Sequence, residues 1–423
     1  MSRREQPHRD HTHRNGPSRR RLLKGAALGA GALAVPGVAY ATAADGGAQP
    51  KGAPAAKAFT HPGMLHGADD FARMAERVGA GTAPWTAGWE RLTANRHSAA
   101  GWTPRPAETV VRGGEGQNYP NLYHDVHAAY QNALRWKVTG DTAHADTARD
   151  ILNAWSGTLE AVTGNADRFL ASGIYGYQFA NAAEIMRDYD GFDLPRCQDM
   201  LARVFYPLCD DFLKDHNDAC VTNYWANWDL CNMAAVMAIG ILNDDQAKFD
   251  QVVDYFHQGE GNGSLPNAVP FLHDGGLGQW QESGRDQGHT LMGIGLMGTV
   301  CEMAHKQGTD LYGADDNRFL KACEYVAKYN RGESVPFSTY EWGHGRNCEP
   351  RSHTVISEAS RGQQRPVWER VYHHYRHRAG LETPYVALLA GAQSPEGGGG
   401  DYGNESGGFD ELGFGTLTYV LEA

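Results

Sequence analysis

The sequence has little that would tie the protein to a metal, a membrane or a nucleic acid. Its seven cysteines are widely spaced and include no CxxC pair, which argues against a zinc ribbon or a redox motif. The apolar run at 25–40 is too short, and too rich in Ala and Gly, to be a membrane anchor. Acidic residues outnumber basic ones by 50 to 38, so no phosphate-binding basic stripe is expected. We therefore expect no nucleic-acid partner, no metal and no organic cofactor.

Basic residues are concentrated at the N-terminus. The sequence SRRRLLK at 18–24 precedes the apolar run, and small residues near 39–43 suit signal peptidase. This pattern predicts a cleaved twin-arginine signal over 1–43, a flexible Gly/Ala/Pro/Lys-rich tether over 44–57 and a single domain over 58–423. The signal holds eight Lys/Arg and two Asp/Glu, so the rest of the chain carries −18 where the whole carries −12. We expect a secreted monomer that has no membrane contact after cleavage.

Amphipathic helices joined by short polar turns recur along the chain. Apolar spacing and turn residues predict helices over 123–138, 142–155, 229–242, 246–257, 288–307 and 317–329. Gly caps the end of one helix and Asp the start of the next, as in the turn Thr139-Gly140-Asp141. Strand patterns are scarce, with short candidates near 335–340 and 414–421. The predicted fold is mostly α: an (α/α) toroid or incomplete barrel of antiparallel helical hairpins around a central cleft.

The cysteines give two alternatives. Cys220 and Cys231 are a candidate disulfide pair for an oxidising compartment, while most of the others suit buried positions on helices. Because their number is odd, one thiol stays unpaired within a monomer.

Two segments combine side chains that suit sugar chemistry. The first, TNYWANWD at 222–229, gathers two amides, a phenol and two indoles just before an apolar helix. Aromatic faces stack on sugar rings and amides bond hydroxyls, although the two tryptophans could equally pack in the core. The second, QWQESGRDQGHT at 279–290, leads into another apolar helix and places Arg285 and His289 four residues apart, on one helix face. Ion pairing at the surface is the alternative for its charged residues.

These segments resemble alginate lyases of the (α/α)-toroid fold. The run 224–228, the SLPN stretch at 264–267 and the helix start at 285–291 occur in the same order, and the likeness covers roughly residues 115 to 390. The overall pattern is most similar to polysaccharide lyase family 38, whose members cleave alginate or glucuronan. The resemblance implies an exported polysaccharide lyase that cuts an acidic uronate polymer by β-elimination and leaves 4,5-unsaturated uronate ends.

The resemblance also implies roles for particular residues. Arg285 would neutralise the sugar carboxylate, Asn223 would donate to the developing enolate, and His289 with a tyrosine would transfer protons. The chain departs from the family pattern, because Val221 and Thr222 stand where those lyases have Asn-His, and His289 stands where their catalytic tyrosine begins the helix. Tyr340 is the candidate for the missing tyrosine, with Tyr224 in reserve.

Further residues are predicted to contact substrate. They lie in four stretches that carry aromatic, amide or cationic side chains: Asn118, Tyr119 and His124; Tyr224, Asn227 and Trp228; Trp280, Gln281 and Glu282; Trp342, His344, Arg346 and Arg351. His124 could instead be a capping or core histidine. The three histidines of the helix expected over 367–378 are interpreted as a solvated basic face, not a metal site.

Two other functions fit part of the pattern. An (α/α)-barrel glycoside hydrolase would need two opposed carboxylates, for which Glu282 and Asp286 are the local candidates. A non-catalytic glycan-binding protein would use the tryptophans as platforms.

Overall fold

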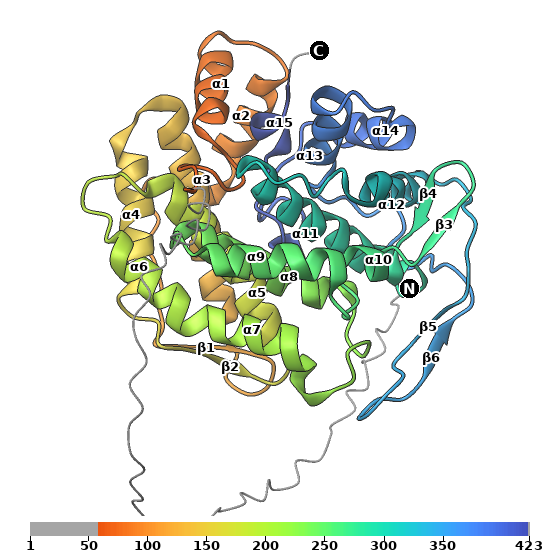
Figure 1. The fold of residues 1–423 in the computed structure, drawn as a ribbon. Coiled ribbons are helices and arrows are strands. Elements are labelled where there is room, and N and C mark those ends of the chain that lie inside the picture. The colour runs from red at the N-terminus through yellow and green to blue at the C-terminus, as the bar shows by residue number, and fades with distance from the viewer. Residues whose placement is uncertain (1–57, 422–423) are drawn as a thin grey trace, which may run out of the picture. The chain divides into compact units, whose positions relative to one another are not determined.

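A computed structural model describes residues 58–421, which belong to one compact unit. The predicted signal and tether lie outside the described residues. Figure 1 shows a body of helices with small hairpins at its edge. The helices are α1 Ala68–Gly79, α2 Trp85–Ala94, α3 Tyr119–Thr139, α4 Thr142–Ser156, α5 Arg168–Met186, α6 Leu194–Met200, α7 Tyr206–Asp215, α8 Ala226–Leu242, α9 Gln246–Gln258, α10 Leu265–Ala268, α11 Gln287–Lys306, α12 Ala314–Asn330, α13 Trp368–His373, α14 Pro384–Gln393 and α15 Gly415–Thr418.

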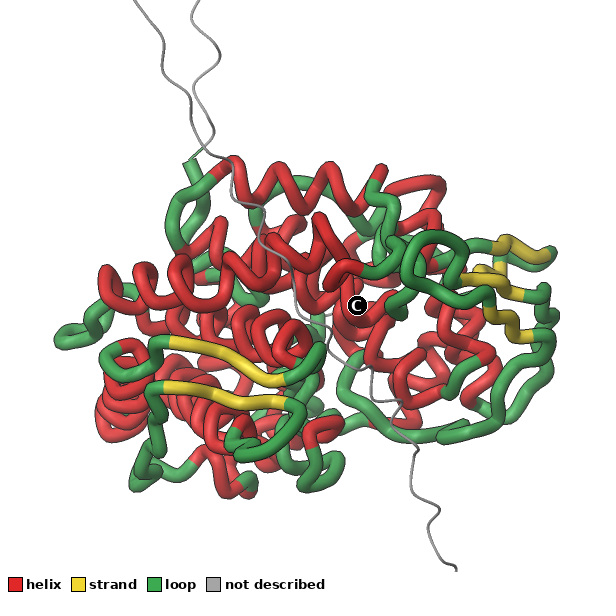
Figure 2. Tube along the Cα trace, turned by 90° about the horizontal axis from the view of Figure 1, so that it is seen from below, coloured by secondary structure: helices red, strands yellow, loops and turns green. Residues whose placement is uncertain are grey.

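The strands form three two-stranded sheets, visible in yellow in Figure 2. Parallel β1 and β2 pair Thr109–Arg112 with Ala161–Gly164. Antiparallel β3 and β4 pair Phe271–His273 with Leu277–Gln279, and antiparallel β5 and β6 pair Tyr340–Trp342 with Arg351–His353. No described helix is both long enough and apolar enough to cross a bilayer.

The inner helices run parallel, so their N-termini gather at one end of the fold. On α5, Gly173 lies against Cys231 of α8, and Gly176 against Ala235 one turn further along both helices. A Cβ on Gly173 would come within 2.5 Å of the Cys231 sulfur, so this helix pair needs glycine there. Near their C-terminal ends, α5 and α11 meet where the Asn181 amide lies 3.6 Å from the Met303 sulfur. Outer helices such as α4 and α9 return the chain between inner ones, which makes the predicted (α/α) toroid.

The predicted turn chemistry accounts for the helix ends. Gly140 ends α3 in the left-handed conformation, and the carboxylate of Asp141 accepts the Ala143 N–H at the start of α4. Asp245 starts α9 in the same way by accepting the Lys248 N–H.

Four local expectations were wrong. Helix α8 begins at Ala226, three residues earlier than its apolar pattern suggested, because residues from another segment cap it. Residues 414–421 contain the helical turn α15 instead of a strand, and the strand near 335–340 begins only at Tyr340. The three-histidine helix is not a solvated face, because His373 and His374 are buried, with His374 stacked on Tyr312 at 3.6 Å between ring centroids.

A C-terminal segment at 405–412 lies among the inner helices. The carbonyl of Phe409 accepts hydrogen bonds from His127 on α3 and Gln178 on α5. Arg365 pairs with Asp410 at 2.8 Å, and Arg370 on α13 pairs with Glu411. The middle of the ring is therefore packed by the chain's own C-terminal residues.

The disulfide joins Cys220 to Cys348 and not to Cys231, which is a buried free thiol. All five free cysteines, Cys231 included, are buried, as expected for small apolar residues on helices. The bond ties the loop before α8 to the loop between β5 and β6, which are 128 residues apart in the sequence.

We expect five reactive thiols in the denatured, unreduced protein and seven after reduction, because only one pair is bonded. Reduction should lower the free energy of unfolding by about 2–4 kcal/mol, since it frees a long loop in the unfolded chain. Thiol titration in denaturant and chemical unfolding with and without reductant measure the two effects.

The variants Cys220→Ser, Cys348→Ser and the double variant should lose the same stability, because each removes one and the same bond. Costs that add up in the double variant, or seven thiols before reduction, would contradict the pairing.

Candidate active site

A buried carboxylate from one segment caps the helix that begins in another. Trp225, at the N-cap position of α8, provides no capping side chain. The side chain of Gln281 accepts the Ala226 N–H at 3.0 Å, and Glu282 accepts the Asn227 N–H at 3.3 Å and its side-chain amide at 2.5 Å. A carboxylate is favourable at this position because a helix N-terminus carries partial positive charge. The two sequence segments that suit sugar chemistry therefore meet.

Arg285 compensates the buried charge of Glu282. The Glu282 side chain has no exposed area, and burial raises its pKa while the Arg285 guanidinium, 2.9 Å away, opposes that rise. The guanidinium carbon also lies 5.0 Å from the ring centroid of Trp225. About a quarter of the Arg285 side chain is exposed, so its outer face can still receive an anion.

His289 lies beside Arg285 in a fixed tautomer. Its Nδ1 is 2.7 Å from Oδ2 of Asp286, and its Nε2 is 3.1 Å from Nη2 of Arg285. A guanidinium nitrogen only donates, so Nε2 is the accepting, unprotonated nitrogen and Nδ1–H donates to Asp286. The side chain of His289 is 43% exposed, which leaves the ring accessible from solvent.

Asp286 holds this histidine while it starts α11. As the N-cap residue it accepts the His289 N–H through Oδ1 at 2.8 Å and the ring Nδ1–H through Oδ2. Burial acts to raise its pKa, but the hydrogen bonds and charges of His289 and Arg285 outweigh burial, so the pKa is lowered. The sequence signal for this contact is an Asp three residues before a His at a helix start.

Tyr340 lies in a buried network and not on an open surface. Its hydroxyl donates to Asn262 at 3.0 Å and accepts from Gln281 at 3.1 Å, and burial raises its pKa. The Asn262 amide in turn donates to the carbonyls of Thr222 and Tyr224. This network fixes the loop before α8. Tyr340 and Gln281 therefore hold that loop in place, whereas the sequence predicted a catalytic role for Tyr340 and a substrate contact for Gln281.

The aromatic residues divide into supports and accessible faces. Trp280 is completely buried against Gly293 and Trp342 is 3% exposed, so neither offers a platform for a sugar in this conformation. Trp342 instead packs on Trp225 at 4.7 Å between centroids, and His353, not predicted from the sequence, stacks on the same indole at 5.7 Å.

Tyr224, Trp228 and Asn223 are all half-buried. The Tyr224 hydroxyl accepts from the amide of Asn217, and its ring contacts Trp228 at 4.7 Å. The Asn223 side chain makes no hydrogen bond to any residue within 58–421, although its backbone N–H donates to Cys220. Its amide is therefore available to a ligand.

A second polar group surrounds the N-terminal half of α3. Arg112 lies 5.0 Å from the ring centroid of Tyr119 and donates to the Tyr175 hydroxyl. Asn118 is structural, because its side chain bonds the backbone of β1 at Thr109 and Val111. His124 is half-buried beside Phe409. Arg112 was missed in the sequence because no motif surrounds it.

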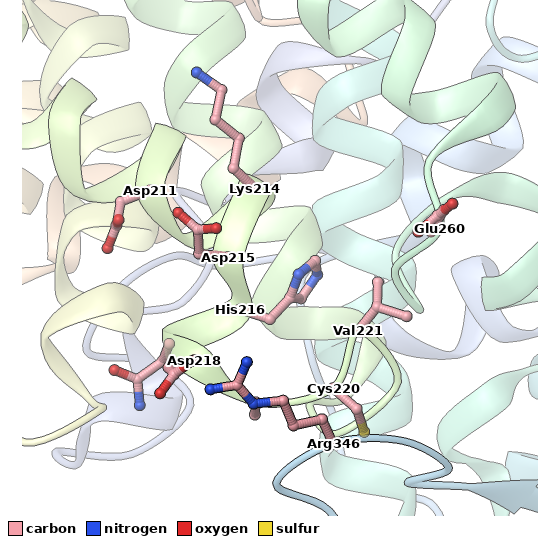
Figure 3. A pocket seen from close by; sticks show the side chains of 11 residues that line it. Asp211, Lys214, Asp215, His216, Asp218, Cys220, Val221, Glu260 and Arg346 are labelled. Carbon is pink, nitrogen blue, oxygen red and sulfur yellow. The ribbon is translucent and has the colours of Figure 1, made fainter.

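The remaining predicted cations lie on the β5–β6 hairpin. His344, Arg346 and Arg351 are exposed. Arg346 reaches a pocket of about 610 Å³ next to Cys220 (Figure 3). This pocket also holds Lys214 and His216, but four acids line it as well: Asp211, Asp215, Asp218 and Glu260. Its acidic lining makes it a poor receptor for a uronate.

Comparisons with known proteins identify the family of the chain. The pattern of the alginate lyase family matches residues 84–337. No curated protein sequence matches the chain. An alginate lyase from Bacteroides ovatus has a similar structure, with a TM-score of 0.57 and 15% identity over 86% of this chain and 100% of that one. Alginate lyase A1-III from Sphingomonas species A1 gives a TM-score of 0.52 and 14% identity over 84% of this chain and 95% of that one. Since the family pattern spans more than half of the chain and the toroid is shared, the chain belongs to the alginate lyase family and is a polysaccharide lyase.

Proposed function

We propose that the protein cleaves a uronate polymer, alginate or glucuronan, by β-elimination at the helix starts of α8 and α11. The observation that carries the proposal is His289, half-exposed, with Nδ1 held by Asp286 and Nε2 unprotonated beside Arg285. A β-elimination needs a base next to a cation that neutralises the sugar carboxylate, and these two side chains supply both.

The first step is charge neutralisation. Nη2 of Arg285 exchanges the ring nitrogen of His289 for the carboxylate at C5 of the sugar, while Nη1 stays on Glu282 and the guanidinium stays beside Trp225. The free amide of Asn223 donates to the oxygen that gains charge as the C5–H bond breaks. Both contacts stabilise the enolate more than the starting carboxylate, so they lower the barrier.

The second step moves one proton. Nε2 of His289 takes the C5 proton, and Asp286 stabilises the imidazolium that forms. The electron pair then forms the C4=C5 bond, the C4–O4 bond breaks, and O4 takes the proton back from Nε2. One imidazole thus serves as base and acid, and the product carries a 4,5-unsaturated ring. Tyr340 is assigned to holding the loop, since its hydroxyl is engaged on both sides.

The hydrolase alternative is weaker. Glu282 is fully buried and committed to Asn227 and Arg285, and Asp286 caps α11. Neither carboxylate is free to protonate a glycosidic oxygen across a cleft. The disulfide further supports the proposal that the enzyme works after export, in an oxidising compartment.

We expect His289→Ala to lower kcat on alginate or glucuronan by about 10²–10⁴, because the proton carrier is lost. Arg285→Lys should also lose at least about 10², since a lysine does not form the two-pronged carboxylate contact. The measurement is the ultraviolet absorbance of the unsaturated product. Arg285→Ala is less suitable, because it would leave Glu282 buried without its partner.

His257→Ala is the matched control, since His257 is exposed on the outer helix α9. It should keep the wild-type rate. Wild-type rates in both site variants would rule out this site, and reducing ends without absorbance would indicate hydrolysis.

A single proton carrier also predicts stereochemistry. It can act only on sugars whose C5 hydrogen and O4 lie on the same ring face, which is true of mannuronate and glucuronate but not of guluronate. We expect polymannuronate or glucuronan to be cleaved at least about tenfold faster than polyguluronate, measured as kcat/KM on block-pure polymers.

Tyr340→Phe should keep kcat within about tenfold and lose about 1 kcal/mol of stability for its hydrogen bonds.

Equal rates on polyguluronate, or a Tyr340→Phe variant as inactive as His289→Ala, would contradict the single-carrier mechanism while leaving lyase activity itself intact.

A further inference from the structure

A hydrogen-bonded chain of three residues ends at a half-buried histidine on α3. Oδ1 of Asn95 accepts the backbone N–H of His97 at 3.0 Å and lies 3.0 Å from Nδ1 of the same histidine. Nε2 of His97 lies 2.9 Å from Nδ1 of His124. The rings of His97 and His124 stack with an interplanar angle of 12°.

The amide of Asn95 sets the direction of every proton in this chain. Its Nδ2 donates to the carbonyl of Gly399 and to Asp401, so its oxygen must face His97. Nδ1 of His97 therefore carries a hydrogen, and its Nε2 accepts. Nδ1 of His124 must then be the donor, which leaves Nε2 of His124 unprotonated.

The surroundings keep both rings neutral. Burial, together with the charges of His124, His127 and Arg96, lowers the pKa of His97 to about 2. Burial, with Arg96 and Arg105, lowers the pKa of His124 to about 4. At neutral pH the imidazole rings of His97 and His124 are therefore uncharged, and Nε2 of His124 has a lone pair that can accept a hydrogen bond.

The free nitrogen of His124 lies at the end of the fold that holds the proposed site. His124 is in the second turn of α3 and His289 is in the first turn of α11, and the inner helices share one direction. Within 58–421 no residue hydrogen-bonds Nε2 of His124, and the atom is not among the buried unpartnered ones. Tyr123 and Phe409 pack on the ring at 4.5 and 4.8 Å between centroids, which fixes its plane.

We propose that His124 is a substrate-positioning residue that accepts a hydrogen bond from a sugar hydroxyl, with Asn95 and His97 setting its tautomer. This rests on the proposed function, because the ligand is the same uronate chain. A neutral acceptor cannot bind a carboxylate, which has no hydrogen to donate, but it suits the 2- or 3-hydroxyl of a mannuronate. His124 thus binds a hydroxyl group of the sugar, whereas Arg285 binds the carboxylate.

We expect His124→Leu to raise KM for deacetylated polymannuronate about tenfold with kcat nearly unchanged, the pattern of a lost ground-state contact. His124→Gln should recover part of the loss, because its amide oxygen accepts. Wild-type enzyme should have a lower kcat/KM on 2,3-O-acetylated polymannuronate, which lacks the hydroxyl hydrogen, and His124→Leu should narrow that difference. His257→Leu, on the outer surface, is the matched control.

An unchanged KM and an unchanged preference for the deacetylated polymer in His124→Leu would overturn the proposal. If that variant does not fold, ring-nitrogen NMR of His289→Ala decides instead. Deacetylated oligomannuronate must shift the Nε2 resonance of His124, and no shift overturns the proposal. A protonated Nε2 in the free protein would overturn it as well. Wild-type enzyme that yields no unsaturated product from any uronan would instead refute the proposed function, which separates the two failures.

Discussion

The buried carboxylate of Glu282 is the interaction on which the site depends. It accepts from the first turn of α8 in place of the capping side chain that Trp225 does not provide, and it pairs with Arg285. A charge without exposed surface persists only when such partners compensate it. Removing either partner would therefore affect two helix starts at once. The same contact places the guanidinium over the Trp225 ring and beside His289, so the stability of the fold and the geometry of the site rest on one ion pair.

Hydrogen-bond chains decide which nitrogen each histidine offers. At His289 the carboxylate of Asp286 accepts a hydrogen bond from Nδ1–H. At His124 the acceptor is the imidazole of His97, whose tautomer is fixed by the amide of Asn95. The two sites differ in their neighbours. Asp286 places a carboxylate beside His289, which suits the proposed proton carrier, whereas burial together with Arg96 and Arg105 lowers the pKa of His124, which suits a hydrogen-bond acceptor. One residue type thus serves two purposes, and the partner at Nδ1 separates them.

The helices could be predicted because periodicity and turn residues are local signals. The Gly140–Asp141 turn and the Asp245 cap follow directly from the sequence, and so does the closeness of Arg285 and His289. The disulfide partner of Cys220 and the capping of α8 by Glu282 could not be predicted, because each depends on a segment far away in the chain. Residue type also misled where polar groups satisfy one another: Tyr340 resembles a catalytic phenol in sequence, yet its partners are Asn262 and Gln281.

The net negative charge of the protein opposes the binding of the polyanion proposed as its substrate. The repulsion that the net charge exerts on a polyanion is largely screened by salt beyond about 8–10 Å. The parallel inner helices bring their N-termini to one end, where each adds partial positive charge. Arg285 lies at that end, where Glu282 and Asp286 offset its charge, and Arg112 lies beside Tyr119 at the start of α3 and donates to the Tyr175 hydroxyl. At contact distance a guanidinium pairs directly with a carboxylate, whereas salt screens the repulsion from more distant acids, so the proposed uronate contact at Arg285 is compatible with the net negative charge.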